Sequence, residues 1–204
     1  MVPQVSDRLE LSRHMSDAFT RIGSVVNQGP YDKSDLEAPQ ELVDFGCIAF
    51  VPNPLVGVRA EVEEGTQRIV AISFDYKDST LQVQAFATPK GNSMWEDVLE
   101  DIATSLKNQD ISMERHAGPF GLELYAEIPT GINKTKSVRM FGVDGQRWLL
   151  RGTVSGAAIS ELDSKAELEN IFRGIVVDRG EVPLPPRELL PLNLPAGAIA
   201  PKAN

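Results

Sequence analysis

Apolar and polar positions alternate along the chain from residue 43 to about residue 154, and this period of two predicts strands. Val58, Ala60 and Val62 alternate with Arg59, Glu61 and Glu63. Glycine, proline and Asp-Gly turns separate neighbouring segments, so we expect the strands to pair as antiparallel hairpins. The expected strands are 43–52, 58–64, 68–76, 80–88, two within 111–129 around a Gly-Pro turn, 137–143 and 146–154.

Two segments instead repeat their apolar residues with the period of an α-helix. They are 94–109 and 160–177, and Ser93 with Glu96 fits a capping box at the start of the first. A third amphipathic helix is expected in residues 1–29, ending at Gly29-Pro30.

This order predicts an α+β fold, with a mostly antiparallel sheet built from hairpins and helices packed on it. Residues 1–42 are expected to be an N-terminal helix and linker, and 43–182 a single domain. Residues 183–204 are rich in proline and are expected to form an extended tail. A packed or solvated tail is favoured over a polyproline ligand for another protein.

Charge is unevenly distributed along this acidic chain of 204 residues with net charge -9. An acidic protein is unsuited to broad nucleic-acid binding, which depends on neutralising phosphates. Residues 130–156 nevertheless hold five basic residues and one acidic residue, Asp144. The candidate binding surface is therefore the basic hairpin 138–152, with an Asp144-Gly145 turn.

With a two-residue turn, Phe141 would lie opposite Trp148 and Arg139 opposite Leu150. Arg147 and Arg151 would share the other face, roughly 13 Å apart. That spacing suits an extended acidic surface better than a single phosphate. Pairing of each arginine with a carboxylate of this protein is the favoured alternative. The candidate ligand- or partner-binding residues are Arg139, Arg147, Arg151, His116 and Tyr125, the last two as candidates for proton transfer.

Catalytic and cofactor motifs are missing from the sequence. Cys47, the single cysteine, lies in an apolar run and is expected to be a buried, inert thiol, and the two histidines are far apart. We therefore expect no metal site, no catalytic residue and no cofactor. No run of about 20 apolar residues predicts a membrane helix, and the first 17 residues have no apolar signal region. We expect a cytoplasmic protein.

Six stretches carry a resemblance to a known family: "GPYD" at residues 29–32, "STLQVQAFATPK", "WEDVLEDIATSL", "GPFGLELYAEIP", "FGVDGQRWLLRG" and "IFRGIVVDRGEVPLPPRELLPLNLP". Together they resemble an uncharacterised family of actinobacterial cytosolic proteins, a domain of unknown function, over roughly residues 29–195. The resemblance implies a bacterial, cytosolic protein and supplies no catalytic residue. The order of elements also resembles the scaffold shared by Mog1 and PsbP, an antiparallel sheet flanked by helices.

The leading expectation is a non-enzymatic binding or adaptor protein whose partner is another protein. The alternative is a protein, with or without catalysis, that binds a small molecule or phosphorylated anion on the basic hairpin. A peripheral membrane role through residues 1–29 ranks last, because that segment mixes charges of both signs. An exposed sheet edge could allow a homo-oligomer, although nothing in the sequence requires one.

Overall fold

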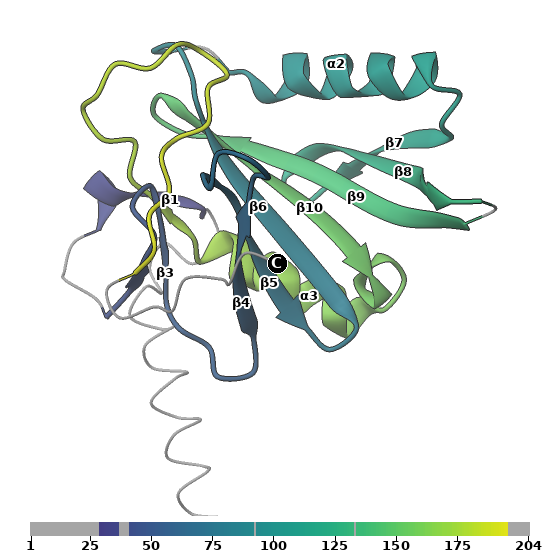
Figure 1. Ribbon diagram of the computed structural model, residues 1–204, viewed down its shortest axis with the longest axis horizontal. Helices are drawn as coiled ribbons and strands as arrows, with labels where there is room; N and C mark the ends of the chain where they lie inside the picture. Colours follow the sequence, from purple (N-terminus) through teal and green to yellow (C-terminus); the bar gives the residue numbers. More distant parts are fainter. Residues whose placement is uncertain (1–28, 37–40, 92, 133, 196–204) are drawn as a thin grey trace, which may run out of the picture.

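The computed structural model describes residues 29–36, 41–91, 93–132 and 134–195. The expected helix in residues 1–29, and with it the membrane alternative, lies outside these residues except for Gly29. Most of the described chain belongs to one large sheet, a smaller sheet and two α-helices (Figure 1). The predicted α+β fold with antiparallel hairpins is confirmed.

The large sheet has seven antiparallel strands in the order β4-β5-β6-β10-β9-β8-β7. Their alternating sequences give each strand one face toward each side of the sheet. The strands are β4 (Gly57–Val62), β5 (Ile69–Tyr76), β6 (Ser79–Ala87), β7 (Met113–Gly118), β8 (Gly121–Gly131), β9 (Lys134–Asp144) and β10 (Trp148–Gly156).

The smaller sheet joins strands near the start of the described chain to a strand at residues 176–177. Its order is β1-β11-β3-β2, and β1 runs parallel to β11 while the other pairs are antiparallel. The strands are β1 (Tyr31–Asp32), β2 (Val43–Asp44), β3 (Ile48–Phe50) and β11 (Val176–Val177). Short 3₁₀ turns, η1 (Lys33–Asp35) and η2 (Ala157–Ile159), follow β1 and β10.

The two α-helices cover opposite faces of the large sheet (Figure 1). α2 (Trp95–Asn108) lies over β7, β8 and β9, with Leu99 and Ala103 packed against Leu124 and Leu149. α3 (Leu162–Arg173) lies on the other face, and its buried side chains join the larger core. That core includes Phe74, Leu81, Val83, Phe141, Trp148, Leu150, Val154, Leu168 and Phe172.

The start of α2 differs from the predicted capping box. The N-cap is Met94, one residue after the expected Ser93, and its side chain makes no capping bond. The Asp144 carboxylate instead accepts hydrogen bonds from the N–H groups of Met94 (2.9 Å) and Trp95 (3.1 Å) and from the Ser93 hydroxyl (2.7 Å). The β9–β10 hairpin therefore supplies the cap, because its turn lies against the helix N-terminus.

The predicted register of the β9–β10 hairpin is wrong. Phe141 lies opposite Gly152 rather than Trp148, and Asp144 with Leu149 is the last pair before the turn. The turn is longer than two residues, and it closes with a bond of 2.8 Å from the Gly145 N–H to the Trp148 carbonyl. Phe141 and Trp148 still share a face, as expected, because both belong to the core beneath α3.

Residues 43–52 do not form the single strand that was expected. They fold back on themselves as the β2–β3 hairpin, in which Val43 pairs with Phe50 and Asp44 with Ala49. Gly46 has φ +89°, a left-handed conformation that suits glycine, and its N–H donates to Asp44 Oδ1 at 2.7 Å. Alternation alone does not reveal this turn, because the segment is apolar on both sides of it.

The folded unit extends beyond the expected bounds 43–182 at both ends. Tyr31 pairs with Val176 in the small sheet. In the proline-rich segment, the Leu190 N–H donates to the Ala85 carbonyl at 2.9 Å, and the Asn193 N–H donates to the Phe45 carbonyl at 2.8 Å. Residues 187–193 are therefore an extended strap along β6 and the β2–β3 hairpin.

Candidate functional site

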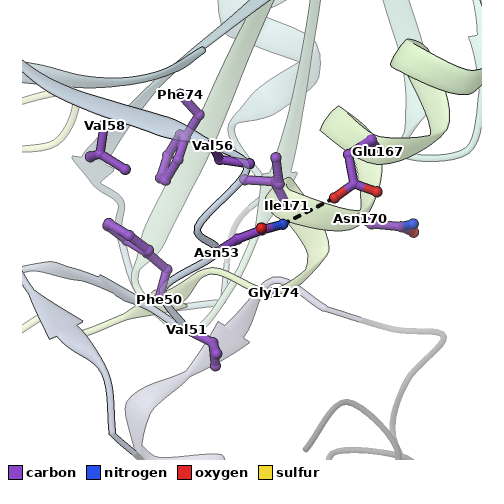
Figure 2. A pocket seen from close by; sticks show the side chains of 10 residues that line it. All are labelled: Phe50, Val51, Asn53, Val56, Val58, Phe74, Glu167, Asn170, Ile171 and Gly174. Carbon is purple, nitrogen blue, oxygen red and sulfur yellow. Dashed lines mark hydrogen bonds between the residues drawn. The ribbon is translucent and has the colours of Figure 1, made fainter. Parts of the chain in front are cut away.

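An apolar groove lies between α3, the loop that joins β3 to β4, and strands β4 and β5 (Figure 2). Its inner part is a pocket of about 40 Å³, and an open hollow of about 800 Å³ continues from it toward β2. Both parts share Phe50, Asn53, Val56 and Val58. We call this the α3 groove; its inner pocket is lined by Phe50, Val51, Asn53, Val56, Val58, Phe74, Glu167, Asn170, Ile171 and Gly174.

Asn53 shapes the loop at one side of the α3 groove. Its side-chain oxygen accepts from the Leu55 N–H at 3.0 Å, and its carbonyl accepts from the Val56 N–H at 3.1 Å, which makes a tight turn. Its side-chain amide donates to Glu167 Oε1 at 3.3 Å and so ties the loop to α3 (Figure 2). The turn leaves Leu55 74% exposed beside the groove.

Helical spacing brings Glu167, Asn170 and Ile171 to the groove, because residues three and four apart lie on one side of a helix. Leu168 and Phe172, on the neighbouring side of α3, are buried against the sheet. One side of α3 thus packs against the sheet, and the neighbouring side lines the groove. Glu167 here and Asp44 in the outer hollow put two carboxylates on its rim.

β4 forms one edge of the large sheet, since within the described residues it pairs with β5 alone. Val58 points from this edge strand into both parts of the groove and is 39% exposed. The groove therefore combines apolar side chains with a strand edge that carries backbone donors and acceptors.

Arg139, the first candidate residue, is 1% exposed and already paired. Its guanidinium makes two hydrogen bonds to Glu123, and its Nη1 lies 2.7 Å from Glu169 Oε1 on α3. Burial lowers the pKa of Arg139, but the bonds and charges of Glu123 and Glu169 outweigh this and raise it. An arginine that holds two carboxylates in the core is not available to an external anion.

The other two arginines lie at separate places. Arg151 faces the α2 side of the sheet, where it stacks on Phe86 at 5.1 Å and donates to Gln84. Burial lowers its pKa. Arg147 lies in the hairpin turn at φ +67°, exposed, so it does not share a strand face with Arg151 as expected. The structure does not gather the three arginines into one basic surface.

His116 and Tyr125 lie together on neighbouring strands. Their rings meet edge to face with centroids 5.1 Å apart, and His116 Nε2 is 3.1 Å from Glu114 Oε2. Tyr125 also pairs across the strands with Arg139. The two rings are thus neighbours of the buried ion pair, and His116 itself is exposed.

A family profile matches residues 29–200, which is most of the chain, under the description protein of unknown function (DUF3710). The chain belongs to the DUF3710 family. This confirms the expected membership of a family of unknown function. The actinobacterial origin stays a prediction.

Among solved structures, the DUF3710 chain is similar to the solution structure of cyanobacterial PsbP (CyanoP) from Synechocystis sp. PCC 6803. The identity is 14%, the TM-score is 0.36, and the match covers 64% of this chain and 86% of that one. The expected likeness to PsbP is found, but an identity of 14% and a TM-score of 0.36 support no argument about function. The likeness to Mog1 stays a prediction. No curated protein matches the chain.

Cys47 is the cysteine of this DUF3710 chain, and burial raises the pKa of its thiol to about 12. Across the residues with described positions, no three side chains of histidine, cysteine, aspartate or glutamate gather as metal ligands would. Among the same residues, no helix has the length and apolar character needed to cross a membrane.

The α3 groove was not among the predicted sites. Val58 was correctly placed on the apolar face of its strand, but an apolar strand residue ordinarily indicates core. The signal in the sequence was the turn segment "NPLVG" between two predicted strands, which places the apolar residues Leu55 and Val56 in a loop. Its meeting with Ile171, more than a hundred residues later, depends on the tertiary fold.

Proposed function

We propose that this DUF3710 chain is a non-enzymatic adaptor that binds an extended segment of another protein in the α3 groove. The observation that carries the proposal is the position of Val58. It lies in an edge strand and faces an apolar pocket that also contains Phe50 and Ile171. A segment that adds to β4 as a further strand would gain backbone hydrogen bonds and insert an apolar side chain into this pocket.

The charge at the rim selects the partner's chemistry. Asp44 and Glu167 are acidic, and the chain carries a net charge of -9. A partner segment with lysine or arginine beside its apolar anchor would be attracted, whereas an acidic segment would be repelled. The proposal places both proteins in the cytoplasm, in line with a single cysteine that cannot form an internal disulfide.

The anion-binding alternative has less support. Arg139 is committed to Glu123 and Glu169, and Arg151 is half-buried against Phe86. Arg147 alone of the three is exposed, and one arginine on a turn makes a weak anion site.

The test is selection of peptides from a random twelve-residue display library on the full-length protein. We expect enriched peptides with a large apolar residue flanked by lysine or arginine. Val58→Asp should weaken their binding at least about tenfold, because it places a charge in the apolar pocket. Val182→Asp is the matched control, since Val182 is an exposed valine outside the groove, and it should leave binding unchanged.

Hydrogen exchange of the complex tests the mode of binding. Amides of β4 should become protected when a selected peptide binds, because a peptide strand would cover that edge. Recovery of no consensus peptide, or equal loss of binding in Val58→Asp and Val182→Asp, would refute the adaptor site.

A further inference from the structure

A second hollow, of about 180 Å³, lies on the face of the large sheet that is opposite α3. Val138 lines it and also belongs to the core beneath α2, so the hollow begins where the cover of α2 ends. Five strands, β4, β5, β6, β9 and β10, contribute to its wall. Its remaining lining residues are polar or charged: Arg59, Glu61, Ser73, Thr80, Gln82, Lys136, Thr153 and Ser155. Its size is below the roughly 300–1,000 Å³ of pockets for drug-sized ligands, which indicates a small ligand.

The pairing of the strands places these side chains in two adjacent rows. One row runs Arg59, Ser73, Gln82 and Thr153 across β4, β5, β6 and β10. The next row runs Asp75, Thr80 and Ser155 across β5, β6 and β10. Side chains directly opposite one another share a face and stand about 5 Å apart. The rows therefore form a grid of hydrogen-bonding groups.

One side of this grid is satisfied within the protein. Asp75 accepts from Arg59 Nε (2.6 Å), Arg59 Nη2 (3.1 Å) and the Thr80 hydroxyl (2.8 Å). Glu61 accepts from Arg59 Nη1 (3.1 Å) and the Ser73 hydroxyl (2.7 Å). These bonds fix the β4–β5 wall, with Arg59 as the shared donor to both carboxylates.

The other side of the grid is not satisfied. Within the described residues, the side chains of Gln82, Lys136, Thr153 and Ser155 make no hydrogen bond or ion pair with the protein. Ser155 is 6% exposed as a residue, and its hydroxyl is open to the hollow. Four neighbouring side chains with free hydrogen-bonding groups around one hollow can together bind a polar molecule that fills it.

We infer that this hollow binds a small, neutral molecule with several hydroxyl groups, such as a monosaccharide ring. An amide and two hydroxyls can each donate and accept, which suits hydroxyl groups, and Val138 offers an apolar surface to the ring's C–H groups. Arg59 and Lys136 balance Glu61 and Asp75 in charge, so the grid does not favour an anion. This site is on the face opposite the α3 groove and does not depend on the adaptor proposal.

The test measures saturation transfer by NMR from the full-length protein to the C–H protons of D-glucose, D-galactose, myo-inositol and maltotriose, with inorganic phosphate then added as an anionic competitor. We expect transfer to at least one polyol. A signal from maltotriose without one from glucose would assign the hollow to a sugar within a chain, and the reverse would assign it to a free ring. Loss of the transfer when phosphate is added at equal concentration, or no transfer to any polyol, would overturn the inference.

Variants locate the binding. Thr153→Val and Ser155→Ala each remove one hydroxyl and should weaken binding about five- to tenfold, as expected for a lost hydrogen bond. Thr104→Val is the control, since Thr104 is exposed on α2 away from the hollow, and it should have no effect. Circular dichroism shows whether each variant is folded. Equal binding by folded Thr153→Val and Thr104→Val would overturn the inference.

Discussion

Arg139 on β9 and Glu123 on β8 form a buried ion pair, with Nε 2.7 Å from Oε2 and Nη2 2.8 Å from Oε1. The two parallel hydrogen bonds fix the guanidinium plane, and Phe141 lies under it at 4.7 Å. Glu169 completes the cluster from α3 and so connects the helix to the sheet. Arg139, one of the three arginines of the candidate binding surface, is thus a fixed part of the packing.

Replacing Arg139 with methionine should lower the free energy of unfolding by about 3–5 kcal/mol, because Glu123 and Glu169 would be left buried without a counter-charge. Urea denaturation followed by tryptophan fluorescence measures this. Arg147→Met, in the exposed turn, is the control and should change stability by less than about 0.5 kcal/mol. Similar values for the two variants would mean that the ion cluster does not stabilise the fold.

The strands of the fold could be predicted from the sequence because alternation reports directly which residues share a face. The register of the β9–β10 hairpin could not, since it depends on distant contacts. Trp148 donates from Nε1 to Asp32 at 2.8 Å, and the Arg147 carbonyl accepts from the Thr88 N–H at 3.0 Å. These contacts hold a longer turn than the Asp-Gly pair alone would select.

The candidate sites were harder to predict than the fold. Arg139 was placed on the correct face with Trp148, but its partners Glu123 and Glu169 come from a different hairpin and from α3. The α3 groove and the polar hollow on the opposite face are both lined by strand residues. The local sequence pattern predicts such residues to be either core or solvent-facing, not part of a site. Only the tertiary fold brings residues of α3 and β4 to the same groove at Val58.

Asp144→Ala should destabilise the protein by about 1 kcal/mol, within a range of about 0.5–2, because α2 would lose its cap. The N–H groups of Met94 and Trp95 would then lack their carboxylate partner. Thermal and urea unfolding measure the change. Glu96→Ala removes the acceptor of the capping box that the sequence predicted, and it should cost less than Asp144→Ala. A larger loss in Glu96→Ala than in Asp144→Ala would contradict capping by the hairpin.

The Arg59–Asp75 pair should make stability depend on acidic pH. The bonds from Arg59 and Thr80 hold the pKa of Asp75 below its ordinary value of 3.8, despite the opposing effect of burial. The stabilisation is therefore complete above about that value and is lost as the pH falls through the lowered pKa.

Arg59→Met removes the main cause of this shift. At pH 7 the variant should be less stable by no more than about 1 kcal/mol, because both partners are partly exposed. The difference from the unmodified protein should shrink as the pH falls below 3.8, which urea unfolding at several pH values measures. Lys90→Met, at an exposed turn, should show no such convergence. A constant difference across the pH range would contradict the linkage.

The proline-rich strap should be part of the cooperative fold rather than a dispensable tail. Leu190 is 1% exposed in the larger core, and its N–H donates to the carbonyl of Ala85 in β6. Leu190→Ala should therefore cost about 2–5 kcal/mol, the usual loss when a buried leucine leaves a cavity. Leu194→Ala removes the same atoms from a partly exposed position four residues later and should cost much less. Urea unfolding measures the free energy of unfolding of both variants. If Leu190→Ala were as stable as Leu194→Ala, the strap would not be part of the cooperative fold.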